Sequence, residues 1–182
     1  YFKFQKLEEY NLSLEESIEG VEEIFFRVLS DQLDTSNKKI GFTLSGGLDS
    51  SSILCSIDYL NKNKSLHKDL YSASATFSRI PKDQYPFADE TNEIKDLLGH
   101  TSTTGKLFDF YDEGSLSIAD KISKTDEPIV SPNLYLHETF YEYFRNNEIF
   151  DIFEGLGGDT TISHGTGLLL EHAKKGKYLS LF

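Results

Sequence analysis

Hydrophobic and polar positions alternate along the chain with two different spacings. Apolar residues three and four positions apart mark one face of a helix, whereas short alternating or continuous apolar runs mark strands. This pattern predicts helices at residues 13–33, 50–59, 88–98, 115–122 and 134–144, and strands at residues 39–44, 70–77, 101–107 and 148–153. Ser13 and Glu16 form a capping-box sequence at the start of the first helix. Because strands and helices alternate, the pattern favours βαβ units and a parallel sheet, whose ligands bind beyond the carboxyl ends of the strands.

A glycine-rich turn follows the first predicted strand and leads into the second predicted helix. It consists of Leu44, Ser45, Gly46, Gly47, Leu48, Asp49, Ser50 and Ser51. The backbone N–H groups of such a turn have no partners within the helix, and the positive end of the helix dipole lies behind them. Glycine lets the backbone approach an anion closely, and the serine hydroxyls add donors. The turn therefore predicts a phosphate-binding site, with a plain strand-to-helix turn that binds nothing as the alternative.

The residues of this turn exclude the commonest phosphate loop. A Walker A motif has Lys followed by Ser or Thr after its last glycine, whereas this turn has Asp49 and Ser50. A carboxylate repels phosphates unless a cation lies between them, and hard oxygen ligands suit Mg2+. Asp49 is therefore predicted to hold a magnesium ion against the phosphates.

A second glycine-rich segment follows the last predicted strand and reads Glu154-Gly155-Leu156-Gly157-Gly158-Asp159. In a parallel sheet the two segments open on the same edge. The glycines allow the carboxylate of Asp159 to approach a ligand closely, so Asp49 and Asp159 are predicted to hold one magnesium ion between them. The alternative role of Asp159 is that of a helix N-cap.

Composition limits the class of protein and its partners. Hydrophobic residues make up 38% of the 182 positions, which suffices for one domain with a core of its own. The net charge of −12 is spread without long runs of one sign, which argues against nucleic acid and against an anionic membrane surface as partners. Cys55 is the only cysteine, so no disulfide forms within the chain, and we expect it to be a small buried residue. Together with the lack of an apolar stretch long enough to span a bilayer, this cysteine usage favours the cytoplasm.

The first glycine-rich turn resembles the pyrophosphate loop, or PP-loop, of the ATP pyrophosphatase superfamily. With the second segment it resembles the synthetase domain of the group of asparagine synthetases, β-lactam synthetases and lasso-peptide cyclases. The resemblance implies an adenine nucleotide alpha hydrolase-like fold of the HUP type, a Rossmann-like parallel sheet with helices on both faces. It also implies ATP and Mg2+ as ligands, with Asp49 and Asp159 as the metal pair.

The same resemblance assigns the contacts with ATP. The residues concerned are Leu44, Ser45, Gly46, Gly47, Asp49, Ser50, Ser51, Thr76, Phe77, Gly157 and Gly158. Thr76 and Phe77 end the second predicted strand, where the group binds adenine and ribose. Asp89 and Glu90, which follow that strand, resemble an acidic pair of asparagine synthetases.

The reaction that the resemblance implies is ATP-dependent amide-bond formation, as in asparagine biosynthesis. A substrate carboxylate is adenylated with release of pyrophosphate, and an amine then displaces AMP. The alternative is a non-catalytic nucleotide-binding or scaffolding module, because Leu156 and Thr160 stand where asparagine synthetases carry glutamates. Amidation of the NAD or GMP synthetase type is a further alternative, against which the second glycine-rich segment argues. No catalytic residue is assigned from the sequence.

The whole chain, residues 1–182, is interpreted as one such ATP-binding domain, and as a fragment or one part of a larger or split protein. The glutamine-hydrolysing domain that precedes it in asparagine synthetases is not recognised in this sequence. The catalytic lysine of that group lies on a C-terminal segment, which is not recognised either. Besides ATP and a carboxylate substrate, we therefore expect a separate glutaminase or a C-terminal chain as a partner.

Overall fold

The computed structural model describes residues 12–81, 83, 88–110, 134–158 and 174. Internal contacts divide the chain into two units, Tyr1–Thr35 and Ser36–Phe182. The described part of the first unit contains helix α1 (Leu14–Thr35). The predicted capping box is confirmed at its start, where the N–H of Ser13 donates to Oε2 of Glu16 at 2.8 Å and the N–H of Glu16 donates to Oγ of Ser13 at 3.2 Å.

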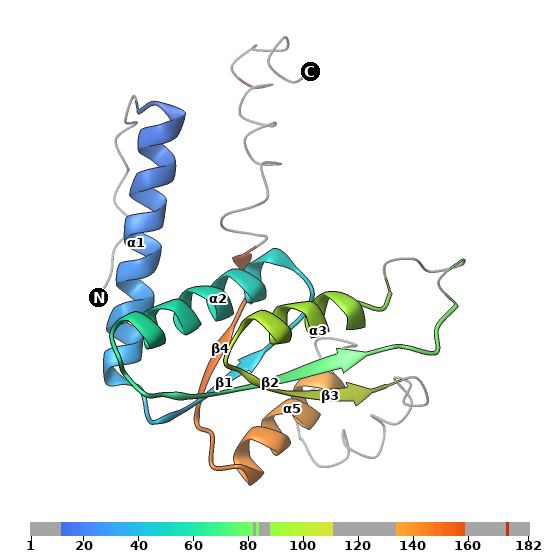
Figure 1. The fold of residues 1–182 in the computed structure, drawn as a ribbon. Helices are drawn as coiled ribbons and strands as arrows, with labels where there is room; N and C mark the ends of the chain where they lie inside the picture. The colour runs from blue at the N-terminus through green and yellow to red at the C-terminus, as the bar shows by residue number, and fades with distance from the viewer. Residues whose placement is uncertain (1–11, 82, 84–87, 111–133, 159–173, 175–182) are drawn as a thin grey trace. The chain divides into compact units, whose positions relative to one another are not determined.

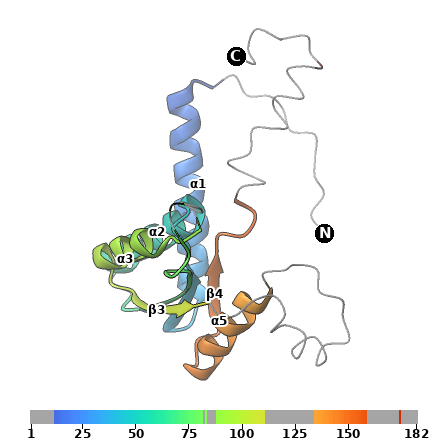
Figure 2. The ribbon, with the colours of Figure 1, turned by 90° about the vertical axis from the view of Figure 1, so that its right-hand side faces the viewer.

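The second unit is built of alternating strands and helices. Its described elements are β1 (Lys39–Thr43), α2 (Leu48–Asn63), β2 (Asp69–Thr76), α3 (Thr91–His100), β3 (Thr104–Asp109), α5 (Leu134–Asn146) and β4 (Asp151–Glu154). The strands form one parallel sheet in the order β3-β2-β1-β4. Helices α2 and α3 lie on one face of the sheet and α5 lies on the other (Figure 1 and Figure 2). The predicted α/β class, a parallel sheet with helices on both faces, is confirmed.

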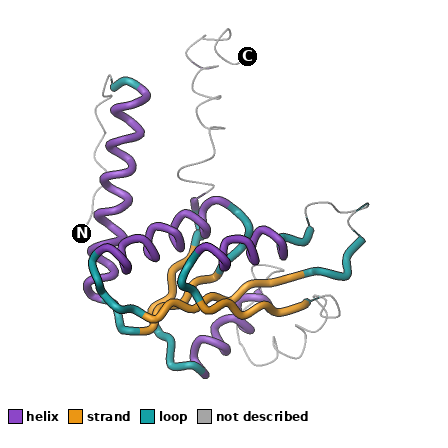
Figure 3. The backbone as a smooth tube through the Cα atoms, viewed as in Figure 1, coloured by secondary structure: helices purple, strands orange, loops and turns teal. Residues whose placement is uncertain are grey.

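The order of the strands reverses beside β1. The chain adds β2 and then β3 on one side of this strand, whereas β4 pairs with it on the other side, as Figure 3 shows. Ligands of open parallel sheets bind beyond the carboxyl ends of the strands at such a reversal. The two glycine-rich segments follow β1 and β4, the strands that flank this reversal.

The face of the sheet that α5 covers is packed mainly with aromatic side chains. Its buried core consists of Ala73, Phe110, Phe140, Phe144 and Ile149. The ring of Phe144 lies so close to β1 that a Cβ added at Gly41 would come within 2.9 Å of it. Burying a Phe side chain contributes about 1.5–3 kcal/mol to stability, so this core fixes α5 on the sheet.

The opposite face is packed mainly with aliphatic side chains from α2 and α3. Its buried residues are Ile40, Phe42, Leu54, Ile57, Leu70 and Ile94. Cys55 is exposed, so the prediction that it is buried was wrong. The reason is helical geometry, because the neighbouring residue Leu54 and the next-turn residue Ile57 are the ones that α2 turns toward the sheet.

Two helices of the second unit begin at other residues than the sequence predicts. Helix α2 begins earlier, at Leu48, because Gly47 already serves as its N-cap. Helix α3 begins later, at Thr91, because the side chain of the preceding Asp89 bonds to the end of β2. The carboxylate of Asp89 accepts hydrogen bonds from the N–H of Phe77 and from the hydroxyl of Thr91, which ties the start of α3 to the end of β2.

The connection from α5 to β4 also differs from the prediction. Glu148 has a φ of 59°, in the left-handed region, and the N–H of Ile149 donates to the carbonyl oxygen of Phe144 at 2.9 Å. These residues close the C-terminal end of α5, so the strand begins at Asp151. The helix predicted at residues 115–122 lies outside the described residues. Among the described helices, none is apolar over a length that would cross a membrane.

Candidate functional site

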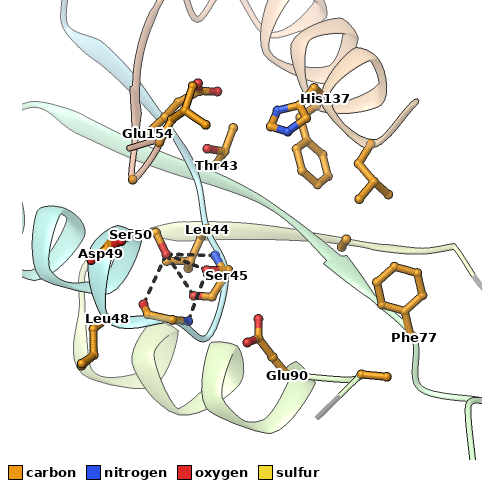
Figure 4. A pocket seen from close by; sticks show the side chains of 17 residues that line it. Thr43, Leu44, Ser45, Leu48, Asp49, Ser50, Phe77, Glu90, His137 and Glu154 are labelled. Carbon is orange, nitrogen blue, oxygen red and sulfur yellow. Dashed lines mark hydrogen bonds between the residues drawn. The ribbon is translucent and has the colours of Figure 1, made fainter. Parts of the chain in front are cut away.

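A cavity of about 590 Å3 opens at the carboxyl ends of β1, β2 and β4 (Figure 4). Its volume lies within the range of about 300–1,000 Å3 that small-molecule sites occupy. The first glycine-rich segment lines it with Leu44, Ser45, Gly47, Leu48, Asp49 and Ser50. The second segment contributes Glu154, Gly155 and Leu156, and β2 with α5 contributes Ala75, Phe77, Leu136, His137 and Phe140. Both glycine-rich segments therefore open into one cavity.

The first glycine-rich segment is held in shape by its own serines. The Oγ atoms of Ser45 and Ser50 lie 3.0 Å apart, within hydrogen-bond distance. Oγ of Ser50 also accepts a hydrogen bond from the N–H of Ser45 at 3.1 Å, and Oγ of Ser45 accepts one from the N–H of Gly47 at 3.2 Å. The predicted phosphate donors Ser45 and Ser50 thus already hold the turn in one conformation.

The N-terminus of α2 faces the cavity directly after this turn. Its N-cap, Gly47, has φ −74° and ψ 157°, and no side chain in the described part of the chain caps it. The N–H groups of Leu48, Asp49 and Ser50 precede the first hydrogen bond of the helix, which the N–H of Ser51 donates to Gly47, so they are left for a ligand or water. The helix dipole favours an anion at this place by about 0.3–1 kcal/mol.

A carboxylate already contacts this turn. Oε2 of Glu90, at the start of α3, accepts a hydrogen bond from the N–H of Gly46 at 3.0 Å. A Cβ added at Gly46 would come within 2.9 Å of Cβ of Glu90, so glycine is required for this close approach of the turn to α3. One of the N–H groups predicted to bind phosphate thus holds a side-chain anion in this structure.

The second glycine-rich segment packs directly against the first. A Cβ added at Gly158 would lie 2.2 Å from Oδ2 of Asp49, and one added at Gly155 would lie 2.7 Å from the backbone nitrogen of Ser50. Gly157 has a φ of 87°, a conformation that favours glycine. The glycines of this segment therefore permit a contact that larger residues would prevent, with the half-buried Asp49 at its centre.

The predicted metal pair can be followed only in part. Asp49 lines the cavity, whereas Asp159 lies outside the described residues. Within the described part of the chain, no group of three or more His, Cys, Asp or Glu side chains is arranged to hold a metal ion. The pairing of Asp49 with Asp159 stays a prediction.

The other predicted ATP contacts are distributed unequally around the cavity. Phe77 lines it, whereas the side chain of Thr76 is 5% exposed and donates to the carbonyl oxygen of Phe108 at 3.2 Å within the sheet. Ser51 belongs to the first turn of α2, where its N–H donates to the carbonyl oxygen of Gly47 at 3.3 Å. The side chain of Thr76 is therefore engaged within the sheet and the N–H of Ser51 within the helix, and neither residue lines the cavity.

Sequence reasoning did not assign the residues that line the far side of the cavity. Thr43 and Glu154 are neighbours in register at the ends of β1 and β4, a position that the strand ends alone could have indicated. Leu136, His137 and Phe140 come from α5, which is distant from both loops in sequence. Nothing in the local sequence around these three residues indicates that α5 reaches the cavity.

Glu154 is paired with a tyrosine. The hydroxyl of Tyr141, on α5, donates to Oε1 of Glu154 at 2.8 Å. Partial burial of the phenol, the hydrogen bond to Glu154 and the negative charge of that carboxylate together raise the pKa of Tyr141 to about 12. Tyr141 therefore stays protonated and donates a hydrogen bond to Glu154 throughout the neutral pH range.

The described wall of the cavity carries negative charge and contains neither Lys nor Arg. Its charged side chains are Asp49, Glu90 and Glu154. Figure 4 shows Glu90 and Glu154 on opposite sides of the cavity. A phosphate ligand at the first glycine-rich segment therefore requires a cation to offset the carboxylates.

The chain was compared with the models of known protein families. The model of a protein family described as asparagine synthase matches residues 20–179. The matched range contains both glycine-rich segments and every element of the sheet. No curated protein matches the chain.

Proposed function

Because the chain belongs to the asparagine synthase family, we propose that it uses ATP to activate a substrate carboxylate as an acyl adenylate and then transfers the acyl group to an amine. Membership of this family supports an ATP-using, ligase-type enzyme in general. The adenylation step and the residues assigned to it below belong to the proposal.

The contact between the two glycine-rich segments carries the proposal. Gly158 lies against the carboxylate of Asp49, and Gly155 lies against the backbone of Ser50, at the point where the strand order reverses. In open parallel sheets this point is where ligands bind. The β- and γ-phosphates of ATP would lie against the N–H groups of the first segment, and Ala75 with Phe77 would form an apolar wall for the base.

A magnesium ion fits the chemistry of this site. The half-buried Asp49 supplies an oxygen ligand beside the phosphate position, and the described wall contains neither Lys nor Arg to neutralise a triphosphate. Mg2+ is commonly held by one or two carboxylates together with substrate phosphates, so Asp49 and, by the resemblance, Asp159 would hold it. When bound, the ion would neutralise the charge that develops on departing pyrophosphate.

The residues of the chain would act on the leaving group in the first step. A carboxylate oxygen of the substrate forms a bond to the α-phosphorus, and the bond from that phosphorus to the bridging oxygen breaks, so pyrophosphate leaves with the electron pair. The N–H groups at the N-terminus of α2 stabilise the developing charge. In the second step an amine nitrogen bonds to the acyl carbon, AMP leaves, and one proton is released.

A non-catalytic nucleotide-binding module is the second candidate, and Leu156 favours it. This side chain lines the cavity and is 87% exposed, yet it can neither donate nor accept a hydrogen bond. A protein that retained only the phosphate loop would bind ATP without forming AMP. The two candidates therefore differ in one measurable product.

Exchange of radiolabel between pyrophosphate and ATP tests the proposed function. The protein is incubated with ATP, Mg2+, labelled pyrophosphate and a panel of carboxylates that includes L-aspartate, L-glutamate and simple monocarboxylates. We expect carboxylate-dependent exchange, and a loss of at least about a hundredfold in the Asp49→Ala variant, as for other groups that stabilise a transition state. Asp96→Ala is the matched control, because its side chain is 80% exposed and does not line the cavity. Binding of ATP without exchange for any carboxylate would favour the non-catalytic module.

A further inference from the structure

Glu154 stands at the edge of the sheet where the two glycine-rich segments meet. It is the last residue of β4, it lines the cavity, and its neighbour Gly155 touches the first turn of α2. Its partner in register, Thr43, ends β1 directly before the first glycine-rich segment. The carboxylate of Glu154 therefore shares one cavity with the proposed phosphate site.

The two oxygens of this carboxylate differ in their surroundings. Oε1 accepts the hydrogen bond of the Tyr141 hydroxyl at 2.8 Å. No other hydrogen bond or ion pair joins the Glu154 side chain to the described residues. Because Tyr141 is fixed to α5, whose aromatic core packs on the sheet, it restricts the orientation of the carboxylate, and among the described residues Oε2 has no partner that would compete with a ligand.

The three carboxylates of the cavity are not equivalent. Asp49 lies against Gly158, and Glu90 bonds to the N–H of Gly46, so both belong to the phosphate side. Glu154 lies across the cavity from Glu90, as Figure 4 shows. It is thus placed for a ligand other than the phosphates, and its negative charge favours a cationic one.

We propose that Glu154 binds the amine that attacks the acyl adenylate and accepts its proton, and that Tyr141 is the residue that positions the carboxylate for this task. This inference rests on the proposed function, because the acceptor of the proposed reaction is an amine. It also assigns proton transfer to the carboxylate of Glu154, since the neighbouring lining residue Leu156 has no group that can accept a proton. The ligand class is a primary amine or ammonia, which reaches the site as its ammonium form.

The proton balance of the step can be written with this residue. The ammonium ion first binds at Oε2 of Glu154 and yields one proton to the carboxylate, which frees the nitrogen lone pair. The nitrogen then bonds to the acyl carbon while the bond from that carbon to the AMP oxygen breaks, and AMP leaves with the electron pair. The second proton lost from the nitrogen passes to solvent, and Glu154 returns its own proton to solvent before the next cycle.

The test compares two nucleophiles with different needs for a base. Ammonium chloride supplies a nucleophile that must lose a proton, whereas hydroxylamine is already neutral at pH 8. For wild type, Glu154→Gln and Tyr141→Phe, amide, hydroxamate and ATP–pyrophosphate exchange are measured with the carboxylate that gives the fastest exchange. Glu142→Gln is the matched control, because Glu142 is an exposed acid on α5 beside Tyr141 and does not line the cavity.

The expected results are ratios within each variant. In Glu154→Gln the rate of amide formation from ammonium falls about a hundredfold or more relative to exchange, as expected for loss of a general base. Hydroxamate formation falls less than fivefold relative to exchange. Tyr141→Phe shows the same pattern with a loss of about tenfold, expressed mainly in the KM for ammonium, and Glu142→Gln equals wild type.

Each other outcome has a distinct meaning. If Glu154→Gln forms amide from ammonium at the wild-type ratio, the inference is overturned while the proposed function stands. If it loses amide and hydroxamate equally, Glu154 has a structural role and the inference is again overturned. If wild type shows no exchange with any carboxylate, the proposed function fails, and the role of Glu154 fails with it.

Discussion

The carboxylate of Glu90 accepts a hydrogen bond from the backbone N–H of Gly46, with 3.0 Å between Oε2 and the nitrogen. This bond joins the start of α3 to the turn that we propose binds the phosphates of ATP. Phosphate and the Glu90 carboxylate therefore compete for the same N–H group. A bound nucleotide must displace this side chain or accept one donor fewer.

We expect Glu90→Ala to bind pyrophosphate more tightly than wild type in the absence of Mg2+. The variant frees the N–H of Gly46 and removes one negative charge, and a charge interaction at an exposed site changes affinity by about twofold to fivefold. Isothermal titration calorimetry measures the change. Asp96→Ala is the control, because it removes an acid of α3 that is 80% exposed and does not line the cavity. Weaker binding by Glu90→Ala would mean that Glu90 supports the turn rather than competing for it.

A pair of glycine variants separates the shape of the site from the stability of the fold. In Gly158→Ala the new Cβ would lie 2.2 Å from Oδ2 of Asp49, the end of a side chain that can move aside. In Gly155→Ala it would lie 2.7 Å from the backbone nitrogen of Ser50, which cannot move without the helix. We expect Gly158→Ala to lose Mg2+-dependent ATP binding by tenfold or more with little change in stability, since a displaced metal ligand costs affinity on that scale. Gly155→Ala should lower the free energy of unfolding by about 1–3 kcal/mol.

Urea unfolding and calorimetry on both variants check this pair. The free energy of unfolding reports the backbone clash, and the binding enthalpy with and without Mg2+ reports the position of Asp49. Equal loss of stability in the two variants would contradict the distinction. Unchanged ATP binding by a folded Gly158→Ala protein would remove Asp49 from the proposed metal site.

The sequence predicted those features of the fold that depend on residues close together in the chain. The capping box of Ser13 and Glu16 involves residues three apart, and the structure contains both hydrogen bonds. The alternation of strands and helices predicted the parallel sheet. Each helix carries the chain back along the sheet, so that the next strand runs parallel to the one before it. The predicted starts of α3 and β4 were wrong. The start of α3 depends on the hydrogen bond between Asp89 and Phe77, and the start of β4 depends on the left-handed conformation of Glu148.

In the candidate site, too, the sequence predicted the features that lie within one segment and missed the contacts between separate elements. Its two glycine-rich segments are continuous in sequence, so their residue types alone indicated where they lie. The contacts of Glu90 with Gly46 and of Tyr141 with Glu154 join residues from different elements. No local pattern carries such information, because these pairs meet only after the sheet has formed.

The aromatic core beneath α5 should be the most sensitive part of the second unit. Phe144 is fully buried and fills the space that Gly41 leaves, so Phe144→Ala creates a cavity between the helix and β1. We expect a loss of about 3–5 kcal/mol in the free energy of unfolding, measured by urea denaturation. Tyr141→Phe on the same helix should change stability much less, because Tyr141 is 42% exposed. Similar losses in both variants would contradict the proposed anchoring of α5 by Phe144.

Acid should weaken the contact between α2 and the connection that precedes β3. Asp58, on α2, is buried, with 5% of its surface exposed, and burial raises the pKa of its carboxyl. Hydrogen bonds from Lys62 and from the N–H and hydroxyl of Ser102 outweigh this effect. The pKa of Asp58 is therefore lowered overall. A lowered pKa in the folded state means that the unfolded chain binds the proton more readily. The stabilisation is therefore complete above the ordinary Asp pKa of about 3.9 and is lost as the pH falls through the lower folded-state value.

Comparison with Asp58→Asn measures this contribution. The free energy of unfolding of both proteins is determined in urea at pH 7, 5, 4 and 3. At pH 7 we expect Asp58→Asn to be less stable by about 1–3 kcal/mol, because the amide accepts the bonds of Lys62 and Ser102 less well than a carboxylate. The difference should stay constant down to pH 5 and shrink toward pH 3, where wild type loses its own charge. A difference that stays constant to pH 3 would mean that packing around residue 58, rather than its charge, holds α2 to this connection.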